Sequence, residues 1–270
     1  MGRLARYALF LICAIQFVFA IAYFLQVPFA VSLWPFEGTT PLTYIFISSI
    51  FAAAAASTLW ATATKNYGAL AGIGFDYIVI LAPLAVLSFK LGISAGTTLL
   101  IVFGAVSLLG ALFGIGLVLW SIRIPIDNAI SMPGLVRWSF ALFIIALLIV
   151  STRLILRVPN SIPWKITPDL SLVIGFMFLG AALYFVYALV RPSWLNSAGQ
   201  LAGFLAYDVV LIVPFLTRLP TVPPEHQVGL IIYTLVVASS GLLAIYYLFI
   251  GKATRLWGRS AKRPDGLASG

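Results

Sequence analysis

The chain has very little charge. Asp, Glu, Lys and Arg make up 9% of its 270 residues, where a soluble domain carries about a quarter. Apolar residues make up 62% of the sequence. This balance excludes a soluble globular protein and indicates an all-α integral membrane protein, because a chain so apolar would not stay dispersed in water.

Residues that bind metals or carry redox chemistry are almost missing. Cys13 is the only cysteine, which excludes an internal disulfide framework and a thiolate metal cluster. His226 is the only histidine and lies between two apolar segments, so a bis-histidine haem within the membrane is excluded as well. We also expect no lysine inside any of the apolar segments, so a retinal-type Schiff base would have no attachment point. We therefore expect no metal and no cofactor.

Catalytic motifs are missing too. The sequence has no P-loop, no Gly-x-Ser-x-Gly and no carboxylate pair on a polar segment. We therefore expect no catalytic residues and no enzyme activity. The net charge of +9 comes from basic residues at the ends of apolar segments and in the C-terminal tail. That distribution predicts contact with a lipid bilayer and no binding of nucleic acid.

The sequence is rich in long apolar runs. A helix needs roughly 20 apolar residues to cross a bilayer, and eight runs reach that length. Polar residues, prolines or both separate them. The predicted spans are residues 7–26, 43–63, 68–88, 97–121, 138–156, 170–190, 198–217 and 228–250.

The chain also repeats itself. Arg6, Leu25, Val27 and Pro28 recur 131 positions later, and so do Ala71, Gly72 and Pro83. The second copies are Arg137, Leu156, Val158, Pro159, Ala202, Gly203 and Pro214. A repeat of half the chain predicts one four-helix unit and its copy. Its expected parts are a first repeat at 1–131, a second at 132–251 and a basic cytoplasmic tail at 252–270.

The repeat also predicts how the halves are oriented. A unit of four spans returns the chain to its starting side, so the second unit enters the membrane in the same sense as the first. The halves should then be parallel, related by a pseudo-two-fold axis along the membrane normal. Lys and Arg residues collect preferentially on the cytoplasmic side. Eleven of them fall on the side of the two termini and five on the other, which predicts a plasma (inner) membrane protein with both termini in the cytoplasm.

Each copy carries one acidic residue inside its third span, Asp76 in the first and Asp208 in the second. Both lie roughly 13–15 Å from the cytoplasmic end of the helix, near the bilayer midplane. An ionisable group at that depth is costly unless it is paired, neutral or hydrated, so it is a candidate for function. The repeat aligns Asp76-Tyr77 with Tyr207-Asp208, which swaps the order and offsets the two carboxyl groups by about 100° around the helix.

Other polar residues fall at a similar depth. The candidates for handling a substrate or protons are Asp76, Asp208, Tyr77, Tyr207, Gln16, Ser107 and Ser240. Pro83 and Pro214 follow the two acids, and a proline inside a helix kinks it. These residues fit a midplane site with a gate. They fit equally a structural layer in which the aspartates are protonated or accept hydrogen bonds and so hold helices together.

The C-terminal tail is rich in cations. Such a stretch binds anionic lipid headgroups at the cytoplasmic surface. The expected headgroup contacts are Lys252, Arg255, Arg259, Lys262 and Arg263.

Three functions fit these features to different degrees. The parallel repeat and the midplane acids favour a small-solute or proton-linked transporter with a site between the repeats. Short loops and few polar residues fit a non-catalytic subunit or scaffold of a larger membrane complex, in which other membrane subunits would be partners. A lipid-modifying enzyme has the least support, because no acid, base and nucleophile come together.

Overall fold

The computed structural model describes residues 3–126 and 130–254, and in these ranges the chain forms helices joined by short loops. Eight of the helices are long and apolar enough to cross a membrane, which supports an integral, multi-pass membrane protein. The elements are α1 Arg3–Phe24, α2 Pro28–Ser32, α3 Pro41–Ala63, η1 Tyr67–Ala69, α4 Leu70–Ala95, α5 Thr98–Ser121, α6 Gly134–Ile155, α7 Pro168–Val190, α8 Trp194–Arg218, α9 Pro224–Ile245 and a π-helical turn η2 Tyr246–Ile250.

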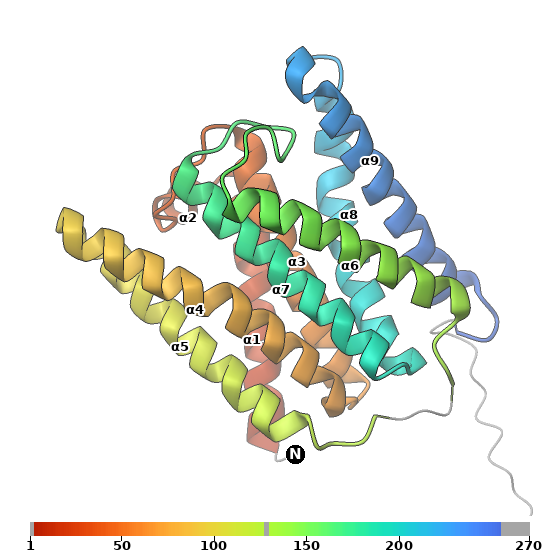
Figure 1. The fold of residues 1–270 in the computed structure, drawn as a ribbon. Coiled ribbons are helices and arrows are strands. Elements are labelled where there is room, and N and C mark those ends of the chain that lie inside the picture. Colours follow the sequence, from red (N-terminus) through yellow and green to blue (C-terminus); the bar gives the residue numbers. More distant parts are fainter. Residues whose placement is uncertain (1–2, 127–129, 255–270) are drawn as a thin grey trace, which may run out of the picture.

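The long helices form two layers (Figure 1). In one layer α1 packs on α3, α3 on α8, and α8 on α9. In the other, α6 packs on α7, α7 on α4, and α4 on α5, and these four run obliquely across α1, α3 and α8. Each layer therefore takes two helices from each half of the chain, and the closest contacts between the halves are α3 with α8 and α4 with α7.

Local sequence signals set where several helices begin. Pro41 and Pro168 are the first residues of α3 and α7, where a missing N–H costs no hydrogen bond. Thr167 caps α7, because its hydroxyl accepts a hydrogen bond from the backbone N–H of Leu170 at 3.2 Å. Pro83 and Pro214 lie inside α4 and α8, as their positions predict.

Aromatic side chains fill the centre between the layers. Phe46 of α3 lies with its ring centroid 5.4 Å from that of Phe178 of α7, and Phe215 of α8 lies 5.0 Å from Tyr233 of α9. Trp164, from the loop before α7, joins this cluster and is buried. Tilted and edge-on aromatic contacts of this kind fix helices relative to one another.

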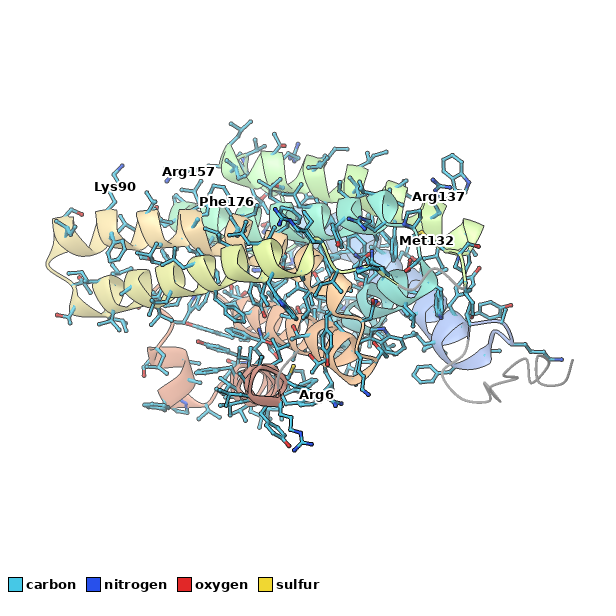
Figure 2. All side chains as sticks on the ribbon, turned by 90° about the horizontal axis from the view of Figure 1, so that it is seen from below. Arg6, Lys90, Met132, Arg137, Arg157 and Phe176 are labelled. Atoms are coloured by element: carbon cyan, nitrogen blue, oxygen red, sulfur yellow. The ribbon has the colours of Figure 1, made fainter. Side chains whose placement is uncertain are left out.

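The predicted spans were right in number, but α1, α6, α8 and α9 begin four residues before the expected starts, and the end of the third span was wrong. Residues 68–88 were expected to end before Lys90, whereas α4 continues to Ala95 and holds Lys90 within it. The expectation that no span contains lysine is therefore wrong as well. Lys90 is exposed and points away from the bundle (Figure 2), and its long stem lets the charge reach the headgroup region without ending the helix. The short helix α2 was not predicted.

Glycines allow α4 and α5 to pack closely. Gly74 and Gly114 face each other, because a methyl group added to Gly114 would lie 2.9 Å from the carbonyl oxygen of Gly74. A methyl group at Gly110 would lie 2.5 Å from Leu81 Cδ1. Small residues are what bring membrane helices together, since lipid supplies no hydrophobic force between them.

We expect Gly114→Ala to destabilise the protein by about 1–3 kcal/mol, because the added methyl forces the two backbones apart. Gly116→Ala is the matched control, since a methyl group there meets nothing within 4 Å. The measurement is thermal unfolding in detergent, followed by size-exclusion chromatography. Equal melting temperatures for the two variants would contradict the close packing.

Candidate functional site

Helices from both halves of the chain line a cavity of about 350 Å³. The first half contributes α3 and α4, and the second contributes α6, α7, α8, α9 and the loop before α7. The cavity lies between the two layers, beside the α3–α8 and α4–α7 contacts. Its walls are mostly apolar, with a few polar groups, as in sites that bind small molecules.

Asp76 reaches the cavity from the first half. It lies on a face of α4 with Ile73 and Ile80, three and four residues away, which is the spacing of one helix face. Its carboxyl group rests against Gly180 of α7, where a methyl group would come within 2.5 Å of Asp76 Oδ1. This Oδ1 atom is buried and has no hydrogen-bond partner among the described residues.

Asp208 reaches the same cavity from the second half, on α8. The residue is only 4% exposed. Ser240 Oγ of α9 lies at donor distance from Asp208 Oδ2, 2.9 Å away, and from the backbone carbonyl oxygens of Val236 and Val237, 2.8 and 3.1 Å away. Within the described ranges, the other oxygen, Oδ1, is buried without a partner. The two intramembrane acids thus line one space and are held by different helices, α7 and α9.

Gln200 adds a third free acceptor that the sequence reasoning missed. It is 1% exposed, and its Nε2 donates to the backbone carbonyl of Tyr184 at 2.7 Å. Its Oε1 is buried and, in the part of the chain described, unpaired. The residue escaped notice because the seventh span was expected to begin at residue 198, which made Gln200 an end residue. The helix begins at Trp194, so Gln200 lies within it.

The remaining predicted residues divide into two groups. Tyr207 and Ser240 line the cavity with the two acids, and the hydroxyl groups of Tyr207 and Tyr233 are hydrogen bonded. Tyr77 does not line it, because its hydroxyl accepts a hydrogen bond from Gln16 Nε2 at 2.7 Å, between α4 and α1. Ser107 is buried on α5, also away from the cavity.

The lining has two further properties. Aromatic side chains surround much of the space, and no Lys, Arg or His of the described residues lines it. The aromatic residues are Phe143, Phe178, Tyr184, Phe185, Phe204, Tyr207 and Tyr233. The cavity is therefore rich in aromatic faces and acceptor oxygens, and it has no cation of its own to balance the two carboxyl groups.

One side of the cavity lies at the molecular surface. Ala146 of α6 lines the cavity and is exposed, and so are Ile232 and Val236 of α9, at 57% and 39%. The two helices do not pack along each other. The cavity therefore opens sideways between α6 and α9, at a rim of apolar side chains that faces the surroundings of the bundle.

A second hollow, polar and basic, lies at the end of the bundle where α6 ends and α7 begins. Arg157, Lys165 and His226 line it, and Arg157 forms an ion pair with Asp169 at 3.3 Å. Both partners of this pair are about half exposed, so the contact adds little stability. The hollow shares residues 160–162 with the wall of the cavity.

Of the predicted headgroup contacts, only Lys252 lies in the described part of the chain, where it is exposed after η2. The other four, Arg255, Arg259, Lys262 and Arg263, lie outside the described residues. In residues 3–126 and 130–254, no group of three or more His, Cys, Asp or Glu side chains could hold a metal ion.

Comparison of the chain with protein families, with characterised proteins and with solved structures finds no match. The function must therefore be argued from the cavity itself.

We expect Ser240→Ala to destabilise the protein by about 1–2 kcal/mol, because it leaves the buried Asp208 carboxyl group with no hydrogen-bond donor. Ser239→Ala is the matched control, since Ser239 is exposed and its hydroxyl bonds only the carbonyl of Val236. Thermal unfolding in detergent measures both. A Ser240→Ala variant as stable as Ser239→Ala would show that the Asp208 contact contributes nothing.

Proposed function

We propose that the protein is a small-solute or proton-linked transporter whose site is the cavity between the two halves. The observation that carries this proposal is that Asp76 and Asp208, one from each half, line the same cavity within the bundle of apolar helices. Acids kept inside a bilayer typically belong to proton relays and solute pathways, because they are costly to hold there without a use.

The arrangement of helices supports the duplication on which the proposal builds. The two layers have the same pattern of contacts between helices. If α1 is exchanged with α6, α3 with α7, α4 with α8 and α5 with α9, the helix pairs in contact in one layer become those of the other. Parallel repeats of this kind relate two halves about an axis along the membrane normal and place the substrate site between them. The boundaries at 131 and 251 are the ones we propose for the two units.

The distribution of basic residues supports an orientation with both termini in the cytoplasm of a cell bounded by a plasma or inner membrane. In that orientation the second, basic hollow lies on the outer side. The side opening between α6 and α9 faces the bilayer in either orientation, because it lies along the length of the helices.

The proposal predicts that the protein carries protons across a membrane and that both acids are needed. In liposomes containing the protein, pyranine fluorescence reports internal pH after a potassium gradient and valinomycin impose a voltage. We expect Asp76→Asn and Asp208→Asn each to lower the proton flux by at least about tenfold, since an asparagine side chain cannot carry a proton. Asp169→Asn, at the exposed ion pair, should conduct like the parent protein.

Unchanged flux in both asparagine variants would reject the transport proposal. The alternative function, a non-catalytic subunit of a larger complex, requires a different result. The protein would then show no flux above that of empty liposomes and would copurify with other chains in fixed stoichiometry.

A further inference from the structure

We infer that the cavity binds a lipophilic organic cation, a primary amine attached to an apolar or aromatic group, which enters from the bilayer between α6 and α9. The inference rests on the proposed site and goes beyond it by naming the chemical class of the substrate. Three features of the cavity carry it: its free hydrogen-bonding atoms, its aromatic walls and its side opening.

The free polar atoms of the cavity are acceptors. Asp76 Oδ1, Asp208 Oδ1 and Gln200 Oε1 are buried and lack partners in the described part of the protein. Buried polar atoms are nearly always hydrogen bonded in folded proteins, so unpaired acceptors on three residues that line one space point to a ligand that brings donors. A primary ammonium group brings three.

Most of the donors that line the cavity are already engaged. Ser57 Oγ donates to the carbonyl of Gly199 at 3.2 Å, Gln200 Nε2 donates to that of Tyr184, and Ser240 Oγ donates to Asp208. The hydroxyl groups of Tyr207 and Tyr233 share one hydrogen bond, which engages one of the two as a donor. An anionic ligand would therefore find few donors and would face two carboxyl groups. A cation finds acceptors, and either carboxyl group, when ionised, is its countercharge.

The walls favour a cation with an apolar body. Phe143, Tyr184, Phe185 and Phe204 bring aromatic faces to the same cavity as the two acids. Aromatic faces attract ammonium groups, and the attraction grows when water is excluded. Phe185 and Phe204 lie with ring centroids 4.5 Å apart and so pack against each other as one apolar part of the wall.

The entrance fits the same ligand. Ala146, Ile232 and Val236 form an apolar rim at the exposed side of the cavity. A molecule that partitions into lipid would meet this rim directly, whereas a strongly hydrated solute would have to leave water to reach it. The occupant is therefore an amphiphile taken from the membrane.

The first test uses the whole chain in lipid nanodiscs and three probes of matched length: 4-phenylbutylamine, 4-phenylbutanol and 4-phenylbutyrate. We expect the amine to bind at least about tenfold more tightly than the alcohol, because a hydrogen bond between charged groups is the stronger kind, and we expect the anion not to bind. Equal binding of amine and alcohol, or tighter binding of the anion, would overturn the inference without any variant.

The second test uses variants. Asp76→Asn and Asp208→Asn should each weaken amine binding at least about tenfold, and Asp208→Glu, which keeps the charge, should restore most of it. Asp169→Asn is the matched control outside the cavity and should bind like the parent. Variants are compared only if they elute as the parent does on size exclusion. Parent-like binding by both asparagine variants would overturn the inference.

The third test concerns the entrance. Ala146→Trp should slow amine association several-fold by filling the rim, whereas Ile245→Trp, exposed on α9 away from the cavity, should leave the rate unchanged. Equal rates would reject entry between α6 and α9. Because binding is measured without a gradient, amine binding with no proton flux would reject transport and leave the ligand class standing. Proton flux that needs both acids, with no amine binding, would reject the ligand class and leave the transport proposal standing.

Discussion

The structure depends on how polar groups are placed in a bundle that hydrocarbon surrounds. Outside water, a carboxyl group must find partners or a polar space within the protein itself. The two intramembrane acids meet this need in different ways at the boundary between the halves. Asp208 accepts a hydrogen bond from Ser240, while Asp76 rests beside Gly180, whose missing side chain leaves it room. The cavity is the space that these constraints leave between the layers.

The layers explain why this space holds residues of both halves. Since α3 packs on α8 and α4 on α7, neither half closes on itself, and any space between the layers is shared. The space is also asymmetric. The proposed repeat aligns Tyr77 with Asp208. Tyr77 accepts a hydrogen bond from Gln16 between α4 and α1, so the first half has no acid at the position equivalent to Asp208. If the chain is the proposed duplication, the polar residues of the candidate site are the ones that distinguish its two copies.

Much of the fold could be predicted from the sequence, because length and apolar character alone define a membrane-spanning helix. The eight helices, with Pro83 and Pro214 inside α4 and α8, followed in this way. The end of α4 did not, since Lys90 reads as a stop signal but tolerates a helix around it. The candidate site could be predicted from the sequence only in part. Asp76 and Asp208 stood out as acids in apolar runs, yet their shared cavity depends on contacts between helices far apart in the chain. Gln200 and the aromatic walls depend on the same contacts.

The central claim is that the two halves enclose one cavity that a small cation can enter. Cysteine reactivity tests it most directly, in a Cys13→Ala background because Cys13 is the only native thiol. The neighbouring residues Ala181 and Ala182 of α7 differ in the required way, since Ala181 lines the cavity and Ala182 is fully buried away from it. A small cationic methanethiosulfonate should modify Ala181→Cys at least about tenfold faster than Ala182→Cys, because a thiol reacts only where a reagent can reach it. Equal rates, or no reaction at either position, would contradict the cavity and the account built on it.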